Sequence, residues 1–289
     1  MQQRCRRFGI SALALVLFSA SVSPAAAQVR IVGVGGFFSP DDNFRHAIVG
    51  TNDGNVTEIF YNPQLGQGQA VLTYIGAQVA VCGFFSSDDN FRHAIVATAD
   101  GSLIEVFYNP QFGLGQTLLA TFSASIRGVG CFYSPDDNFR HAIVGTSDGN
   151  LTEVFYNPQQ GLGRTVLTTF SAGILGVAGF FSSDDNYRHA LVATDDGNVT
   201  EVFYNPQQGQ GRTVLTTFSA GIVGMGGFFS SDDNFRHAIV GTSDGNVTEV
   251  FYNPQQGQGQ TVLANFSGTA PTPGKPRPNA TKPRAGNAP

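Results

Sequence analysis

The sequence contains five copies of one unit, and this repetition limits the available folds more than any other feature. The segment Asp-Asp-Asn-(Phe/Tyr)-Arg-His aligns the copies at His46, His93, His141, His189 and His237, which are 47 or 48 residues apart. A period of about 40 to 50 residues is typical of the blades of a β-propeller. A single sheet of this size cannot bury both of its faces, so the copies must pack against one another.

Each copy has the pattern of four strands. In the fifth copy they are expected at residues 224–229, 236–242, 246–253 and 261–266, with turn-forming residues between them. The 36 Gly and 25 Phe suit strands and tight turns, and they exclude a helical bundle. We predict an all-β, five-bladed β-propeller over residues 31–268, with four antiparallel strands per blade, closed into a ring and monomeric. Either the Gly-rich first strand or the Arg-His-Ala-Ile-Val-Gly-Thr strand is innermost.

The hairpin between the second and third strands of each copy is predicted from its Asp-Gly pair. A two-residue type I′ turn needs a positive φ at both central positions, which Gly adopts freely and Asp tolerates. In the fifth copy this turn, at Asp244 and Gly245, sets the strand register. The expected pairs are Thr242 with Val247, Val240 with Glu249, Ala238 with Phe251, His237 with Tyr252, and Arg236 with Asn253.

The two ends of the chain have different compositions from the repeats. Residues 1–27 have the pattern of an export signal, with Arg4, Arg6 and Arg7 before an apolar stretch and a small-residue cleavage site after Ala27. We therefore expect a periplasmic or secreted protein without a membrane span. Residues 269–289 are rich in Pro, Ala, Lys and Arg, and we expect them to be disordered.

The charge balance of the repeats argues against a nucleic-acid partner. All 21 acidic residues lie between Asp41 and Glu249, whereas residues 31–268 hold only eight of the 16 basic ones. A body with this excess of carboxylates repels a phosphate backbone.

Catalysis is not predicted, because every titratable residue type recurs with nearly the same neighbours. An active site needs unlike groups in unlike environments, and no unique nucleophile and base occur together. We interpret the five histidines as structural. The Asp-Asp-Asn segments are interpreted as turn caps, with Ca²⁺ binding as the less favoured alternative because the EF-hand spacing is missing. No cofactor and no metal are predicted.

Two loops of each blade should share one face and form a candidate ligand site. In an up-and-down sheet, the loop after the first strand and the loop after the third lie at the same end. This places Asp, Asn, Arg and Gln side chains beside aromatic rings, which suits the hydroxyl groups and the apolar face of a sugar. The predicted ligand-binding residues are Asp42, Asn43, Arg45, Asp89, Asn90, Arg92, Asp137, Asn138, Arg140, Asp185, Asn186, Arg188, Asp233, Asn234, Arg236, Asn253 and Gln255.

Two cysteines remain after removal of the signal. Cys82 aligns with Gly35 of the first copy, and Cys131 aligns with Gly36. An oxidising compartment favours a disulfide, but the offset of one residue directs the side chains to opposite faces of their strands. Both the bridged and the unpaired state therefore stay open.

Five such units resemble the five-bladed lectin propellers of the tachylectin type, and the Asp-Asp-Asn-Phe-Arg-His and Asp-Gly-Asn-Val-Thr-Glu-Val-Phe-Tyr segments resemble bacterial lectin-like propeller repeats. The resemblance covers residues 33–268 and implies one shallow ligand site per blade and no active site. We therefore expect a multivalent carbohydrate-binding protein whose partner is a glycan or another repetitive surface. The alternative is a periplasmic scaffold that holds a protein partner and binds no sugar.

Overall fold

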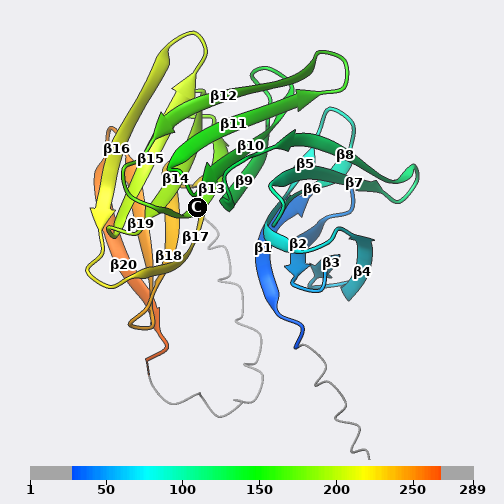
Figure 1. Ribbon diagram of the computed structural model, residues 1–289, viewed down its shortest axis with the longest axis horizontal. Coiled ribbons are helices and arrows are strands. Elements are labelled where there is room, and N and C mark those ends of the chain that lie inside the picture. The colour runs from blue at the N-terminus through cyan, green and yellow to red at the C-terminus, as the bar shows by residue number, and fades with distance from the viewer. Residues whose placement is uncertain (1–27, 268–289) are drawn as a thin grey trace, which may run out of the picture.

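The computed structural model describes residues 28–267, which form twenty strands in five four-stranded antiparallel sheets (Figure 1). The four strands of each sheet lie side by side in chain order. The chain is therefore a five-bladed β-propeller, as predicted from the repeat period.

The blades have nearly identical strand lengths. Blade 1 comprises β1 (Ile31–Ser39), β2 (Phe44–Thr51), β3 (Asn55–Asn62) and β4 (Gly66–Tyr74), and blade 2 comprises β5 (Gln78–Ser86), β6 (Phe91–Thr98), β7 (Ser102–Asn109) and β8 (Gly113–Thr121). Blade 3 comprises β9 (Ile126–Ser134), β10 (Phe139–Thr146), β11 (Asn150–Asn157) and β12 (Gly161–Thr169). Blade 4 comprises β13 (Ile174–Ser182), β14 (Tyr187–Thr194), β15 (Asn198–Asn205) and β16 (Gly209–Thr217), and blade 5 comprises β17 (Ile222–Ser230), β18 (Phe235–Thr242), β19 (Asn246–Asn253) and β20 (Gly257–Asn265).

The Gly-rich first strand of each blade is the innermost one. Strands β1, β5, β9, β13 and β17 follow one another around the axis and line a central channel. The glycines allow these backbones to approach closely, since a Cβ added to Gly35 would lie 2.5 Å from the backbone nitrogen of Gly83 in the next blade. The structure thus decides between the two arrangements that the sequence left open.

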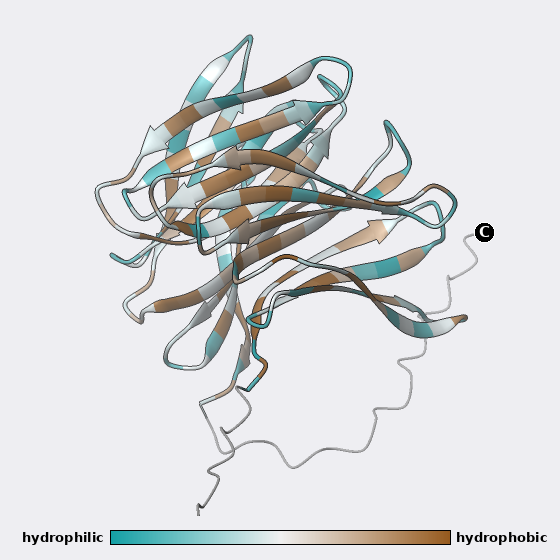
Figure 2. Ribbon diagram, turned by 45° about the vertical axis from the view of Figure 1, so that its right-hand side comes forward, coloured by the Kyte–Doolittle hydropathy of each residue, from teal (hydrophilic) through white to brown (hydrophobic). Residues whose placement is uncertain are grey.

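The hydrophobic core lies between blades and not within them. Four clusters of buried residues are present, and each is shared by two adjacent blades. In the cluster between blades 2 and 3, Leu103 and Val144 are completely buried. Burying one such side chain contributes about 1.5–3 kcal/mol. Polar residues occupy the hairpin loops at the ends of the sheets (Figure 2).

The Asp-Gly hairpin differs from the prediction, and the register is shifted by one residue. The Gly245 nitrogen donates to the Thr242 carbonyl at 3.0 Å, and Gly245 has φ 88°, whereas Asp244 keeps a negative φ. The loop therefore has three residues, a type I turn followed by a left-handed glycine. The observed pairs are Arg236 with Tyr252, His237 with Phe251, Ala238 with Val250, Ile239 with Glu249, Val240 with Thr248 and Gly241 with Val247.

The aspartate of this turn serves as a cap, which explains the longer loop. The Asp244 carboxylate accepts hydrogen bonds from the Thr242 hydroxyl at 2.6 Å and from the Asn246 backbone nitrogen at 3.2 Å. A side chain that accepts from both flanking residues holds its own backbone in the ordinary right-handed region. The type I′ assignment was therefore wrong.

The expected ring is not closed within the described residues. Four junctions join consecutive blades, but no packed junction of this kind forms between β17 and β1, and Figure 1 shows the opening between blade 5 and blade 1. Val34 of β1 is 58% exposed, while its counterpart Val81 in blade 2 is 5% exposed. Within the described residues, the five blades therefore form an open arc.

Within residues 28–267, no helix is long and apolar enough to cross a membrane. The expected export signal at residues 1–27 and the expected tail at residues 269–289 lie outside the described residues.

Replacing Gly197 by Ala tests the hairpin geometry. Gly197 has φ 84°, and an added Cβ would lie 2.2 Å from the Phe218 carbonyl oxygen. We expect the free energy of unfolding to fall by about 1–3 kcal/mol in urea denaturation. The control is Gly176→Ala, whose Cβ would meet its nearest neighbour, Met225, at 3.8 Å, and which should change stability by less than about 0.5 kcal/mol. Equal effects of the two substitutions would contradict the turn described above.

Candidate functional site

The loop after the first strand of each blade is a tight turn held by its own polar side chains. In blade 3, the Asn138 nitrogen donates to the Ser134 carbonyl at 3.0 Å, and the Asp137 carboxylate accepts from the Phe139 nitrogen at 3.0 Å. Asn138 adopts φ 60°, a left-handed conformation that Asn tolerates better than most residues. The Asp-Asp-Asn segments therefore cap turns, as the sequence indicated.

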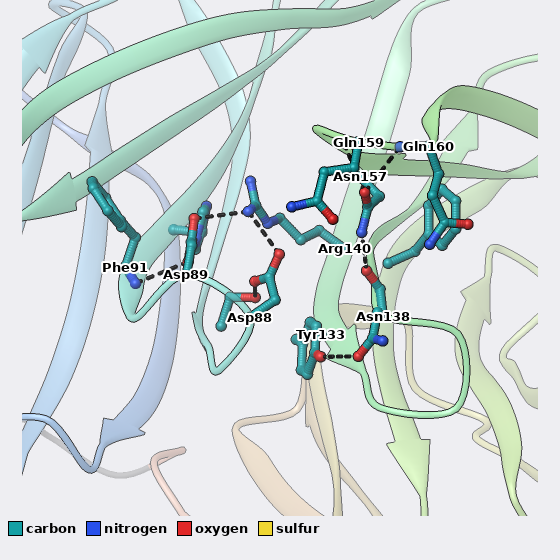
Figure 3. Close-up of polar contacts among 12 residues, drawn as sticks. Asp88, Asp89, Phe91, Tyr133, Asn138, Arg140, Asn157, Gln159 and Gln160 are labelled. Carbon is teal, nitrogen blue, oxygen red and sulfur yellow. Dashed lines mark hydrogen bonds and ion pairs between the residues drawn. The ribbon is translucent and has the colours of Figure 1, made fainter.

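A second loop leans against the first and completes one face of the blade, which we call the loop face. The Asn157 side-chain amide donates to the Asn138 carbonyl at 2.6 Å. Its oxygen accepts from the backbone nitrogens of Gln159 at 2.8 Å and Gln160 at 3.1 Å, and Figure 3 shows this chain of bonds. The prediction that the two loops share a face is confirmed.

An arginine joins each of blades 2 to 5 to the preceding blade through three carboxylates. The Arg140 Nη2 donates to Asp88 at 2.9 Å and to Asp89 at 2.7 Å (Figure 3). Its Nη1 lies 3.6 Å from a Glu105 carboxylate oxygen. The guanidinium also lies over the ring of Tyr156, 5.8 Å from its centroid. Arg92, Arg188 and Arg236 repeat the arrangement at the other three junctions.

These four arginines position the loop carboxylates and are not available to a ligand. Each is at most 7% exposed, and its terminal nitrogens already contact acidic groups. We therefore correct the expectation that Arg92, Arg140, Arg188 and Arg236 contact a sugar. Arg45 differs, because it is exposed and forms no salt bridge with any residue in the described range.

The five histidines are buried and bonded on both ring nitrogens. In blade 3, His141 Nδ1 lies 3.0 Å from Glu153 and Nε2 lies 3.3 Å from Asp137, and the ring stacks on Phe132 with 5.1 Å between centroids. The histidines are thus structural, as predicted, but their partners are Glu and Asp. The expected pairing of His237 with Tyr252 is wrong because of the register shift.

The hydrogen bond between His141 and Asp137 shifts the pKa values of both groups. Burial alone lowers the pKa of His141, but the bonds to Asp137 and Glu153 outweigh it, so the pKa lies above its ordinary 6.5. Burial raises the pKa of Asp137, but the bond to His141 outweighs it, so that pKa lies below its ordinary 3.8. The same directions hold for His93 and His189.

The remaining predicted site residues occupy three environments. The second aspartates of blades 1 to 4, Asp42, Asp89, Asp137 and Asp185, are half-buried between a histidine and an arginine, whereas Asp233 is more exposed. The turn asparagines Asn43, Asn90, Asn138, Asn186 and Asn234 are exposed. Asn253 is buried between the two loops, and Gln255 is exposed beside it.

Two groups of neighbouring residues were missed by sequence reasoning. The glutamates Glu58, Glu105, Glu153, Glu201 and Glu249 contact the histidines, and their constant spacing of 12 residues from each His was the signal that could have found them. The first aspartate of each pair and the aromatic residue at the end of the first strand also lie at the loop face. Tyr133 shows this in blade 3, where its hydroxyl donates to the Asn138 side chain at 2.7 Å.

The loop end of each junction therefore carries a repeated set of polar and aromatic groups. Between blades 2 and 3 the set comprises the Asp88 carboxylate, the Asn138 amide, the Gln159 amide and the Tyr133 ring (Figure 3). Because Arg140 holds Asp88 from behind, the carboxylate is fixed before any ligand arrives. This arrangement can accept and donate hydrogen bonds to a neutral polar molecule.

The central channel is a second, chemically simpler feature. It has a volume of about 590 Å³ and is lined mainly by glycine and aliphatic residues, with Arg127 as the charged side chain among its lining residues. Cys82 and Cys131 form a disulfide at this channel with a Cα–Cα distance of 5.9 Å. Adjacent inner strands pack with an offset of one residue, since a Cβ on Gly35 would lie against Gly83, which aligns with Gly36. Cys82 and Cys131 differ by the same one residue in the alignment of the copies. The offset between the strands therefore brings the two cysteines together.

The part of the chain that the structure describes contains no cluster of three or more His, Cys, Asp or Glu side chains arranged to hold a metal ion. The adjacent aspartates are neutralised by arginine instead.

No protein-family model matches the chain, and no curated protein matches its sequence. The fold is similar to the Aleuria aurantia lectin, described as a six-bladed β-propeller with fucose recognition, at 10% identity and TM-score 0.62 over 84% of this chain and 81% of that one. AofleA from Arthrobotrys oligospora matches at 11% identity and TM-score 0.61 over 83% and 75% of the two chains. BBS1N, solved in complex with ARL6DN, matches at 15% identity and TM-score 0.53 over 79% and 67%. These likenesses establish the propeller fold.

Truncating Arg140 tests the junction. Arg140→Ala leaves three carboxylates, two of them partly and one fully buried, without their shared cation, so we expect a loss of about 3–5 kcal/mol in the free energy of unfolding. The control is Arg212→Ala on the outer strand β16, where the arginine is exposed, and its effect should stay within about 0.5 kcal/mol. Similar losses for both variants would refute the bridging role.

The histidine network predicts how stability depends on pH. Because folding raises the pKa of His93, His141 and His189, their contribution is complete below pH 6.5 and is lost as the pH rises through the raised values. The lowered pKa of Asp137 acts in the opposite direction, with stability present above pH 3.8 and lost as the pH falls further. The midpoint of thermal unfolding should therefore be highest between these limits and decline toward alkaline pH. His141→Asn should reduce the alkaline decline, and an unchanged profile would count against the network.

Proposed function

We propose that this chain is a secreted or periplasmic, multivalent, non-catalytic carbohydrate-binding propeller. One observation carries the proposal: the loop end of each of the four described junctions presents the same fixed carboxylate, exposed amides and aromatic ring. The proposed site residues are Asp41, Phe85, Asn90 and Gln111 between blades 1 and 2, Asp88, Tyr133, Asn138 and Gln159 between blades 2 and 3, Asp136, Phe181, Asn186 and Gln207 between blades 3 and 4, and Asp184, Phe229, Asn234 and Gln255 between blades 4 and 5.

The chemistry of this set favours a neutral sugar over an anion. Asp88 accepts hydrogen bonds from hydroxyl groups, and the amides of Asn138 and Gln159 both donate and accept them. Tyr133 offers an aromatic surface beside them for the apolar face of a pyranose ring. The carboxylates around each junction would repel a negatively charged ligand.

The fold comparisons support a carbohydrate ligand at the level of protein class. The Aleuria aurantia lectin was solved in complex with α-methyl-L-fucoside, and SapL1 lectin was solved in complex with α-methyl fucoside. The identities of 11% and 13% carry over no individual residue, so we propose fucosides as the first ligands to test and not as the assigned ligand.

The number of sites compensates for the weak affinity expected at each one. A shallow loop site buries little area, so each should bind in the millimolar to high-micromolar range, about −4 to −6 kcal/mol. Several equal sites on one rigid body raise the apparent affinity for a repetitive surface by about 10²–10⁴. The pattern of residues 1–27 supports action outside the cytoplasm, where such surfaces occur.

The second candidate is a scaffold that binds a protein. The fold likeness to BBS1N, solved in complex with ARL6DN, favours it. A scaffold for a single protein gains nothing from four nearly identical patches, however, and this is why we place the lectin first.

A glycan array probed with the secreted protein tests the proposal. We expect binding to neutral glycans, with at least a tenfold loss in the variant N90G/N138G/N186G/N234G. Glycine accepts the φ of about 60° that these asparagines adopt, so the substitutions remove the amides without straining the turns.

The matched control lies on the opposite face. The exposed serines Ser123, Ser171 and Ser219 follow the outer strands there, and S123A/S171A/S219A should bind as the unmodified protein does. Full binding by the asparagine variant, or loss of binding in the serine variant, would refute the loop-face site. If no glycan binds the unmodified protein, the scaffold becomes the supported function.

A further inference from the structure

The open arc exposes the two halves of a blade junction at its ends. The blade-5 end face carries Phe228, Asp232, Asp233 and Glu249, and the blade-1 end face carries Val34, Phe38 and Arg45. These are the residues of the repeated unit that meet at the four formed junctions.

The charges of the two end faces are complementary in the same way as at a formed junction. Arg92 contacts Asp41, Asp42 and Glu58 of the preceding blade at 3.0, 2.8 and 3.6 Å. The corresponding residues are Arg45 at one end of the arc and Asp232, Asp233 and Glu249 at the other. Neither set meets its counterpart within residues 28–267.

The apolar residues of the end faces are exposed only because a neighbour is missing. Phe228 is 46% exposed, whereas its counterpart Phe180 in blade 4 is 6% exposed. The Glu249 side chain is 26% exposed, whereas that of Glu105 is fully buried. Exposed apolar groups next to carboxylates that lack the arginine of a following blade mark a surface that binds a partner.

Glycines preserve room on the blade-5 end face for another inner strand. At the equivalent positions of blade 3, a Cβ on Gly128 would lie 2.8 Å from the Val177 nitrogen, and one on Gly130 would lie 2.2 Å from the Gly179 nitrogen. Gly224 and Gly226 have no atom within 4 Å of such a Cβ. The face therefore retains the shape that receives the first strand of a following blade.

The chain's own blade 1 is poorly placed to fill this position. The inner strands of blades 1 and 2 and of blades 3 and 4 are packed at closest approach, and a disulfide holds the junction between blades 2 and 3, so closing the arc would require these three junctions to change.

We propose that the blade-5 end face of one molecule binds the blade-1 end face of a second copy, with Arg45 of that copy entering between Asp232 and Asp233. The contact is heterologous, so each added copy leaves one end face of each kind free and association continues.

Sedimentation with two one-sided variants tests this proposal independently of sugar binding. Arg45→Glu disables the blade-1 end face, and Gly226→Phe fills the blade-5 end face, where the single chain has space for the ring. We expect the unmodified protein to show a mass that rises with concentration, and each variant alone to be monomeric. An equimolar mixture of the variants should form a heterodimer that grows no further, since each molecule keeps one active end face.

The control is Arg212→Glu, an equal change of charge on the outer strand β16, which should assemble as the unmodified protein does. An unmodified protein that is monomeric at every concentration would overturn the proposal and indicate closure of the ring or a foreign partner. A mixture of the two variants that stays monomeric, while the unmodified protein associates, would also overturn it, because the association would then use another surface.

Discussion

The structure depends on one buried charge arrangement, the arginine that each blade inserts between the carboxylates of the preceding blade. Arg140 is tolerated in a nearly dry junction only because Asp88, Asp89 and Glu105 neutralise it. Asp89 also caps the turn through the Phe91 nitrogen and bonds to His93. One carboxylate thus connects a turn, the interior of its own sheet and the next blade, so local and inter-blade order depend on each other.

The same arrangement determines what the loop face can do. The four arginines are buried against carboxylates, so a ligand cannot contact them. The same bonds fix an acceptor carboxylate at the loop end of every junction. A fixed acceptor loses little entropy when a ligand binds, which favours weak but well-defined recognition. Repetition of the unit then supplies multivalency. At the two ends of the arc, the blade-5 end face is acidic and the blade-1 end face is basic.

Two errors in the sequence predictions have clear physical causes. The Asp-Gly pair fits both a two-residue type I′ turn and a three-residue loop, and the choice depends on the hydrogen bond that Asp244 accepts from the Thr242 hydroxyl. That bond shifts the register by one residue and replaces Tyr252 by Phe251 opposite His237. The second error concerned the arginines, whose aspartate partners lie 50 to 52 residues away in the preceding copy, outside any local pattern.

The sequence by itself determined the repeat, the four strands of each blade, the pairing of two loops on one face and the structural use of the histidines. These features follow from strand periodicity and turn chemistry, which act over a few residues. The tertiary structure decided which strand is innermost, which side chains the arginines bind, how Cys82 meets Cys131 and whether the arc closes. Each of these depends on how neighbouring blades pack against each other, and the residues in contact there belong to different copies of the unit, so no pattern within one copy predicts it.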